Sequence, residues 1–230
     1  GNVYGFGSNK YYELTNSYKN NGEIQRIKSF HNISKICCGV KASVILDNKG
    51  YVSTFGFNHH GMLGVQLKDR ISYSGNVNVI KEYQFKIIDC VSSFVIGLTQ
   101  HNELLLWGKN ILGWKKILEA KGEEAEQLNW QKVLAPIYTP KLIHLQVNNA
   151  HIQDIKCGTD HIIIRTYHNN YYCFGAYQYC KTLLFKDTSN YYRIYKPYIQ
   201  AWTNIFQDII DIIPGYETTY ILQKRNFNDD

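Results

Sequence analysis

One stretch of the chain has the alternation of apolar and polar positions that is typical of antiparallel strands. Residues 33–38 carry apolar positions, and Gly39 opens a short connection. Residues 44–46 (Val-Ile-Leu) then predict a strand, and residues 47–50 (Asp-Asn-Lys-Gly) predict a tight turn before a returning strand over residues 51–55. The pattern therefore predicts a hairpin that follows a further short strand.

This pattern occurs three times with an unchanged interval. In each copy a Cys stands 18 residues before a Gly that directly follows an aromatic residue. An internal repeat of this kind predicts an architecture of similar units before any single residue is considered for chemistry. The repeated residues are Cys38, Phe55 and Gly56, then Cys90, Trp107 and Gly108, then Cys157, Phe174 and Gly175.

The turn position of the repeat supports this alignment on physical grounds. It holds Gly50, Asn102 and Asn169 in the three copies. Glycine and asparagine are the residues that best tolerate the positive φ that a tight hairpin turn needs. We therefore expect the same turn geometry in all three units.

Two incomplete copies flank the three complete ones. Gly7 has the surroundings of the repeated Gly, so residues 1–15 correspond to the second half of a unit. Pro214 and Gly215 stand where other copies have Cys-Gly, so residues 213–223 correspond to a first half. Two such halves could close a small ring, because pairing the first and last strands removes exposed edges. The alternative is an arc of a larger ring, which the absence of an initial Met favours.

The composition fits one sizeable globular domain built from strands. Of the 230 residues, 44% are hydrophobic and 14% aromatic, and Tyr alone occurs 19 times. This length is enough to bury a core, and aromatic residues pack well in strands. No stretch approaches about 18 uninterrupted apolar residues, so we expect no membrane insertion.

Charge and cysteine usage bear on the partner and the compartment. The formal net charge of +6 suits an anionic partner, while the abundance of Asn, Lys, Ile and Tyr fits the coding bias of an AT-rich genome. The three repeated Cys are interpreted as reduced core thiols, which predicts an intracellular, reducing compartment. The sequence has no CxxC and no paired ligand spacing, so we expect no metal site.

Further residues of the units follow one recognisable pattern. Residues 157–161 read Cys-Gly-Thr-Asp-His, and residues 55–58 read Phe-Gly-Phe-Asn before Gly-Met-Leu-Gly at 61–64. Residues 107–110 with Gly113 repeat the second part incompletely. This pattern resembles the repeats of the regulator of chromosome condensation family, with Met in place of the usual Gln and with the His lost from most copies.

The resemblance implies an all-β fold, a β-propeller of regulator-of-chromosome-condensation-like repeats whose blades are four-stranded antiparallel sheets. About four blades' worth of sheet would lie in this chain, together with a short helical insert. We expect a single domain over residues 1–230. The expected units are 1–32 (partial), 33–87, 88–151, 152–208 and 209–223 (partial), with inserts at 114–150 and 181–206.

The two inserts carry the candidate partner-binding residues. Residues 115–133 have helical character, which fits either a surface helix or a docking element. Residues 181–206 interleave aromatic and basic side chains, which fit packing on the propeller flank, protein contact or base stacking with phosphate contact. The candidates are Lys115, Lys116, Trp130, Tyr191, Tyr192, Arg193, Tyr195, Lys196 and Trp202.

The other distinctive residues are expected to build the repeat rather than to carry chemistry. The sequence has no Gly-rich phosphate loop with Lys, no GxSxG and no HExxH, so we expect no enzyme and no cofactor. His161 is the most tempting catalytic candidate, but its repeat position predicts a buried hydrogen-bonding role. The structural positions are Gly7, Cys38, Gly39, Gly56, Gly64, Cys90, Gly108, Cys157, Gly158, His161, Gly175 and Gly215.

The leading functional hypothesis is a non-enzymatic protein-interaction scaffold, a propeller-type subunit of a larger multisubunit assembly. A first alternative, implied by the resemblance, is guanine nucleotide exchange on a small GTPase. A second alternative is RNA contact in a ribonucleoprotein particle such as an organellar ribosome, which rests on the net charge and the second insert. Cytoplasm, nucleus and organelle all remain open as the compartment.

Overall fold

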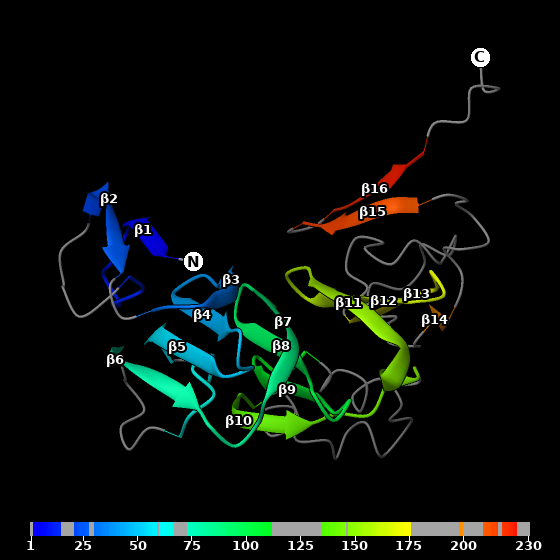
Figure 1. Cartoon of the computed structure of the whole chain (residues 1–230), viewed down its shortest axis with the longest axis horizontal. Coiled ribbons are helices and arrows are strands. Elements are labelled where there is room, and N and C mark those ends of the chain that lie inside the picture. Colours follow the sequence, from blue (N-terminus) through cyan, green and yellow to red (C-terminus); the bar gives the residue numbers. More distant parts are fainter. Residues whose placement is uncertain are drawn as a thin grey trace, which may run out of the picture. The chain divides into compact units, whose positions relative to one another are not determined.

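The computed structural model is built from antiparallel β-strands (Figure 1). The structure describes residues 2–14, 21–27, 30–58, 60–66, 73–111, 135–145, 147–175, 198–199, 209–215 and 218–224. The candidate partner-binding residues and the predicted helical segment 115–133 lie outside these described residues. Those candidates are Lys115, Lys116, Trp130, Tyr191, Tyr192, Arg193, Tyr195, Lys196 and Trp202.

Three sheets have four strands each, and in each sheet the strands pair in chain order. The first sheet holds β3 (Ile33–Cys38), β4 (Ala42–Asp47), β5 (Val52–Phe57) and β6 (Tyr73–Ile80). The second holds β7 (Phe85–Val91), β8 (Phe94–Thr99), β9 (Leu104–Gly108) and β10 (Ile137–Leu142). The third holds β11 (Ile152–Cys157), β12 (His161–Thr166), β13 (Tyr171–Gly175) and β14 (Tyr198–Ile199), and it follows the 3-10 turn η1 (Asn149–His151).

Two further sheets have two strands each. They are β1 (Val3–Gly7) with β2 (Asn21–Ile27), and β15 (Ile209–Pro214) with β16 (Thr219–Gln223). The register identifies each pair as half of the four-stranded repeat. Val3 pairs with Ile27 as Val52 pairs with Ile80, which makes β1 and β2 equivalent to a third and a fourth strand. Pro214 pairs with Thr219 as Cys38 pairs with Ser43, which makes β15 and β16 equivalent to a first and a second strand.

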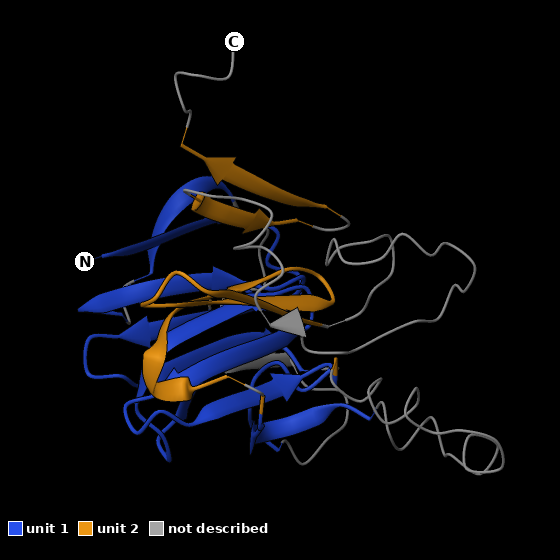
Figure 2. Cartoon of the chain, turned by 90° about the vertical axis from the view of Figure 1, so that its right-hand side faces the viewer, with its two compact units in different colours: residues 1–110, 135–144 blue, residues 111–134, 145–230 orange. Residues whose placement is uncertain are grey.

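The chain divides into two compact units, which Figure 2 distinguishes by colour. Unit 1 comprises residues 1–110 and 135–144, and unit 2 comprises residues 111–134 and 145–230. Unit 1 therefore contains the β1–β2, β3–β6 and β7–β10 sheets, and unit 2 contains the β11–β14 and β15–β16 sheets. The single domain over residues 1–230 stays a prediction.

The predicted turn geometry is confirmed in all three units. The turn residues Gly50, Asn102 and Asn169 have φ values of 88°, 63° and 57°. Each donates its backbone N–H to the carbonyl oxygen three residues earlier, at 2.9 to 3.0 Å. The shared left-handed conformation explains why only Gly and Asn occupy this position.

Strands of the structure cross the approximate unit boundaries or lie within the inserts that the sequence predicted, in three places. β7 begins at Phe85, so a boundary after residue 87 would cut it. β10 and η1 lie within the predicted insert 114–150, and β14 lies within the predicted insert 181–206. The fourth strand of these sheets thus follows a long connection. The outer strand β10 (IYTPKL) also lacks the clear alternation of apolar and polar residues by which a strand is recognised in a sequence.

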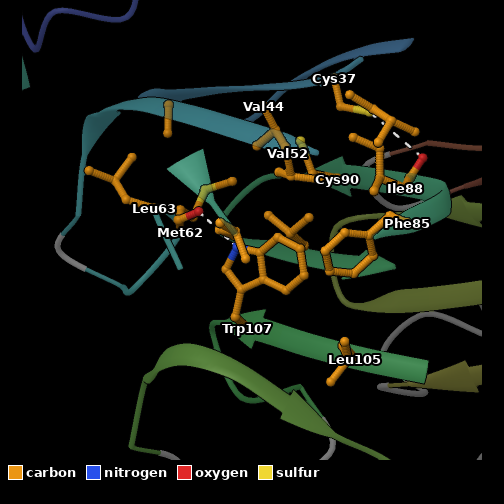
Figure 3. Close-up of a cluster of buried hydrophobic side chains, with 14 residues drawn as sticks. Cys37, Val44, Val52, Met62, Leu63, Phe85, Ile88, Cys90, Leu105 and Trp107 are labelled. Atoms are coloured by element: carbon orange, nitrogen blue, oxygen red, sulfur yellow. Dashed lines mark hydrogen bonds between the residues drawn. The ribbon is translucent and has the colours of Figure 1, made fainter. Parts of the chain in front are cut away.

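The core of unit 1 lies between the β3–β6 and β7–β10 sheets (Figure 3). The indole of Trp107 is fully buried there, and its Nε1–H donates to the Met62 carbonyl at 3.0 Å. Its ring centroid lies 5.7 Å from that of Phe85. Backbone bonds join the same sheets, because Val40 N–H donates to Ser92 O at 2.8 Å. These contacts make the two sheets one packed body.

The repeated Cys positions differ in burial. Cys90 and Cys157 are buried, as expected of core thiols, but the interpretation of Cys38 as a core thiol is wrong because its side chain is exposed. Its neighbour Cys37 is buried instead, with Sγ 3.9 Å from the Ile88 carbonyl oxygen. The difference follows from the face on which each side chain lies: Cys37 faces the β7–β10 sheet, whereas Cys38 lies on the opposite side of β3.

Candidate interaction surfaces

One face of the β1–β2 sheet exposes large apolar side chains. Tyr4 is 57% exposed and Phe6 is 67% exposed, and Ile24 of β2 is exposed on the same face. We call these three residues the β1 face. At the equivalent positions of β9, Leu105 and Trp107 are fully buried against the preceding sheet. The β1 face therefore has the chemistry of a sheet-packing surface without a cover among the described residues.

A second apolar surface lies on the β15–β16 hairpin of unit 2. Tyr220 and Leu222 are both more than half exposed, at 66% and 53%. The register places them at the positions of Val44 and Leu46, which are buried against the following sheet in unit 1. The opposite face of the hairpin is the packed one, since Ile212 is buried there. The hairpin thus presents one covered and one uncovered apolar face.

A third apolar surface is the inner half of one face of the β3–β6 sheet. Ile36 is 46% exposed, and the neighbouring Cys38 lies on the same face. Their equivalents in β7, Ile88 and Cys90, are buried. The outer half of the same face is covered, because Val3 and Ile27 pack there on Ile45 and Phe55. We call the exposed part the inner face.

A groove of about 480 Å³ lies on the same face of the sheet, but neither Ile36 nor Cys38 lines it. Apolar side chains of the sheet and Phe30 line it together with the polar groups of Asp47, His31 and Lys81. Asp47 is already engaged, since its Oδ1 accepts the backbone N–H groups of Lys49 and Tyr51, each at 2.9 Å. Polar and apolar side chains therefore both line the groove. The residues that line it are Phe30, His31, Ile33, Ile45, Asp47, Tyr51, Ser53, Val77, Val79 and Lys81.

His161 lies at the start of β12 and is fully buried. Its Nε2 is 3.3 Å from Thr219 Oγ1. Gly158 allows the imidazole to pack against the backbone, because a Cβ at that position would overlap the ring. Gly158 N–H also donates to the His161 carbonyl at 2.8 Å, as Gly215 N–H does to Thr218 at 2.7 Å. These contacts place His161 in the packing of unit 2.

A charge pair joins β11 to β15 within unit 2. Lys156 Nζ donates to Asp211 Oδ1, and the Ile212 N–H donates to the same oxygen at 2.8 Å. Burial by itself would raise the pKa of the Asp211 carboxyl. The hydrogen bonds from Lys156 and Ile212, with the positive charges of Lys156 and Arg165, outweigh burial and lower that pKa. The ionised carboxylate therefore stabilises the contact between these strands.

Replacing Asp211 with Asn is expected to lower the free energy of unfolding at pH 7 by at most about 1 kcal/mol, because both partners are partly exposed. A lowered folded-state pKa means that the stabilisation is present above the unfolded pKa of about 3.9 and is lost as pH falls through the folded value. Urea titrations should therefore show the variant converging on the wild type as pH is lowered toward 3.

Asp154 provides the matched control for that comparison. It holds the equivalent position of β11, and its Oδ1 likewise accepts the next backbone N–H, from Ile155, at 2.9 Å. Asp154→Asn should therefore report the change from carboxylate to amide at the same local backbone contact, without the loss of the Lys156 pair. Equal pH profiles for the two variants would contradict the role assigned to the ion pair.

The described residues offer little that could hold a metal. They contain no group of three or more His, Cys, Asp or Glu side chains placed to bind an ion. Burial raises the pKa of the Cys173 thiol to about 12, which keeps that group protonated at neutral pH. Within the same ranges, no helix has the length and apolar character needed to cross a membrane.

The buried Asn of the repeat is a positioning residue to which the sequence analysis gave no role. Asn58 Oδ1 accepts the Leu63 N–H at 2.9 Å, and Asn9 Oδ1 accepts the Leu14 N–H at 2.8 Å. Both side chains are buried. Each therefore closes the loop that follows the third strand. The signal was present in the Gly-any residue-Asn spacing, which occurs at Gly7 and again at Gly56.

Comparison with known proteins agrees with the repeat register. No family model matches the chain. An "RCC1-like G exchanging factor-like protein" of Mus musculus is 27% identical over 175 residues, covering 71% of this chain and 34% of the mouse protein. The Homo sapiens protein of the same name is 26% identical over the same length and coverage. The chain is a distant relative of these RCC1-like proteins. The predicted resemblance to regulator of chromosome condensation repeats is thereby confirmed.

Solved structures place this RCC1-like chain in the β-propeller class. Human WBSCR16 matches with a TM-score of 0.61 and 12% identity, covering 97% of this chain and 67% of that one. Prp20p from Saccharomyces cerevisiae, a structure described with its binding to Gsp1p and histones, matches with a TM-score of 0.58 and 15% identity. That match covers 84% of this chain and 42% of Prp20p. The predicted all-β propeller-type fold is confirmed.

Proposed function

We propose that this RCC1-like chain is a non-enzymatic protein-interaction scaffold, a subunit of a larger assembly, and that the β1 face binds a protein partner. The observation that carries the proposal is the exposure of Tyr4 and Phe6 at positions that are buried between sheets elsewhere in the same fold. Contiguous aromatic and aliphatic side chains of this kind are typical of protein interfaces.

The chemistry of the β1 face indicates what such a partner would offer. Tyr4, Phe6 and Ile24 supply apolar area, and Arg26 stands beside Tyr4 on the paired strand. Arg26 is held by Asn2 Oδ1 through an Nη2–H donor at 2.5 Å. A partner with an apolar patch bordered by a carboxylate would complement this arrangement. Burial of the two aromatic rings would provide most of the binding free energy.

The test measures binding in a complex reconstituted from purified components. Partners that co-purify at physiological salt would be identified and then reconstituted with purified chain carrying Tyr4→Lys and Phe6→Lys. We expect at least about tenfold weaker binding for that double variant, since two buried aromatic anchors are lost. Tyr167→Lys, at a 67% exposed position in unit 2, should leave binding unchanged. A chain without any stable partner would overturn the proposal.

Guanine nucleotide exchange is the second candidate function. The printed names of the mouse and human relatives and the Gsp1p binding of Prp20p favour it. This chain covers only 34% of the mouse and human relatives and 42% of Prp20p. What those proteins do is therefore only a hypothesis for this chain. Nucleotide release from a panel of small GTPases tests it, and unchanged release rates would exclude it.

RNA contact remains the third hypothesis. It rests on the net charge of +6 and on aromatic and basic residues outside the described part of the chain. Binding through phosphates should weaken steeply as salt is raised. Binding of single-stranded RNA that is absent, or that does not change with salt, would exclude this role.

A further inference from the structure

We propose that an acidic segment of a partner protein binds at one loop end of unit 1, with its carboxylates on Lys10 and Lys41. These two lysines and the rings of Tyr11 and Phe57 form a small cluster, which we call the lysine–aromatic site. The inference rests on the proposed scaffold function, because it names a further contact of the partner and the chemistry that makes this contact.

The site lies where loops of unit 1 meet. Lys41 belongs to the short loop between β3 and β4, and Phe57 is the last residue of β5. The Phe57 N–H donates to the Lys41 carbonyl at 2.8 Å, which holds the end of β5 against that loop. Lys10 and Tyr11 come from the loop that follows β1. All four residues belong to unit 1, so the site is complete without unit 2.

Lys41 is a cation whose side chain is held in place by the protein itself. Its Nζ lies 4.5 Å from the ring centroid of Tyr11 and 5.2 Å from that of Phe57. The same Nζ donates to the Tyr11 hydroxyl oxygen at 3.3 Å. A lysine side chain usually loses rotamer freedom when it binds a partner, and these contacts remove part of that freedom beforehand. Lys41 is thus preorganised to bind an anion.

The loop that carries Tyr11 is fixed by its own contacts. The Tyr11 N–H donates to Glu13 Oε2 at 2.8 Å, and Ser43 Oγ donates to the Glu13 carbonyl at 2.7 Å. The next residue, Tyr12, has a φ of 64°, a left-handed conformation that a bulky side chain rarely adopts. Such a conformation persists only where the surrounding contacts impose it, and it is most frequent at binding sites. The loop therefore holds the Tyr11 ring in one position.

The two lysines of the site are not neutralised by acidic groups of the protein. Among the described residues, neither Lys10 nor Lys41 makes an ion pair. The Nζ of Lys10 lies 5.7 Å from the same Tyr11 ring centroid, so two positive charges stand near one ring and repel each other. A carboxylate that contacts both would relieve this repulsion. It would also accept charge-assisted hydrogen bonds from the Lys41 ammonium, which uses only one of its three N–H groups on Tyr11.

A protein segment fits the site better than single-stranded RNA does. Aromatic residues that bind RNA need an open ring face on which a base can stack. Here the Tyr11 ring contacts Lys41 and also Phe57, whose ring centroid lies 4.9 Å away. Val40, which precedes Lys41, is 66% exposed and offers an apolar contact beside the charge. These observations favour an acidic segment that also carries apolar side chains.

A binding titration with defined peptides tests the proposal. The probe is a labelled peptide of Glu-Glu-Leu repeats, and the same peptide with Gln in place of Glu is its control. The purified chain should bind the acidic peptide, more weakly as salt is raised, and should not bind the control. Lys41→Gln should raise the dissociation constant about three- to fivefold. Lys49→Gln removes the same charge from the turn at the opposite end of the β3–β6 sheet and should have no effect.

A variant that keeps the charge distinguishes a positioned lysine from net charge alone. Tyr11→Leu removes the ring and the hydroxyl that hold Lys41, and it leaves the charge of the chain unchanged. We expect this variant to bind the acidic peptide about twofold more weakly. The proposal would be wrong if Tyr11→Leu had no effect and Lys49→Gln weakened binding as much as Lys41→Gln. General attraction to a chain of net charge +6 would then explain the binding.

Acylation of lysine side chains supplies a measurement on the unchanged sequence. Bound acidic peptide should protect Lys41 from the reagent more than it protects Lys49. Equal labelling of the two lysines in the complex would contradict the proposed location. An oligouridine that binds more tightly than the acidic peptide and protects Lys41 would assign the site to RNA and overturn the proposal.

This inference and the proposed function fail separately. If the acidic peptide does not bind, while a natural partner still depends on Tyr4 and Phe6, the lysine–aromatic site is refuted and the scaffold function stands. If the peptide binds through Lys41 but the chain has no stable protein partner, the scaffold function is refuted and the chemistry of the site stands.

Discussion

Replacing Trp107 with Ala is expected to lower the free energy of unfolding by about 3–5 kcal/mol. The indole is fully buried between the β3–β6 and β7–β10 sheets, in contact with Phe85. Its removal leaves a cavity in the centre of unit 1 and abolishes the hydrogen bond to Met62 O. Urea unfolding followed by circular dichroism measures the effect without relying on the fluorescence of the residue that is removed.

Trp107→Phe separates the contribution of the hydrogen bond from that of the packing. It keeps an aromatic ring but removes the indole N–H, which leaves the buried Met62 carbonyl without its donor. We expect a loss of about 1–3 kcal/mol, smaller than for Ala. If the two substitutions were equally costly, the hydrogen bond rather than the packing would dominate, and the cavity argument would be wrong.

Replacing Gly108 with Ala is expected to lower the free energy of unfolding of unit 1. The loss should be clearly larger than the backbone strain at this φ would cause by itself. Gly108 has φ +95°, a region that costs a residue with a side chain about 1–3 kcal/mol. A Cβ there would also overlap Ser93 O and lie 2.6 Å from Phe94 Cα, both of the paired backbone. Because backbone cannot rotate away, the β8–β9 pairing would have to open. Urea unfolding of the variant measures the loss.

Gly7→Ala separates the two causes. Gly7 holds the same repeat position with φ +107°, but a Cβ there would meet nothing within 4 Å. Its substitution should therefore cost only the backbone strain, about 1–3 kcal/mol. Gly56→Ala should behave like Gly108→Ala, since its Cβ would lie 2.5 Å from Lys41 O. Equal losses at Gly7 and Gly108 would contradict the close-approach explanation.

These glycines show how far sequence reasoning could reach. The 18-residue interval identified the repeated Gly, and the structure provides the neighbouring backbone that makes it necessary at Gly56 and Gly108. The turn residues were likewise predictable, because φ preference is a local property. The outer strands β10 and β14 were missed, since they follow long connections and have weak alternation.

The candidate surfaces were not predictable in the same way. Tyr4 and Phe6 look like any strand residues in the sequence, as do Tyr220 and Leu222. Their repeat equivalents are buried, so the alignment by itself would assign them to the core. The residues that the sequence favoured for partner contact lie outside the described residues and stay a prediction.

The sequence by itself determined the repeat, its hairpin turn, the aromatic-Gly strand end and the two flanking halves. Each of these depends on local backbone preference or on a period that one chain carries within itself. Only the tertiary structure decided which faces are covered. Ile36 and Ile88 share a repeat position, yet one is 46% exposed and the other is fully buried. Burial depends on whether another sheet lies against that face, and no pattern within a strand records its neighbour.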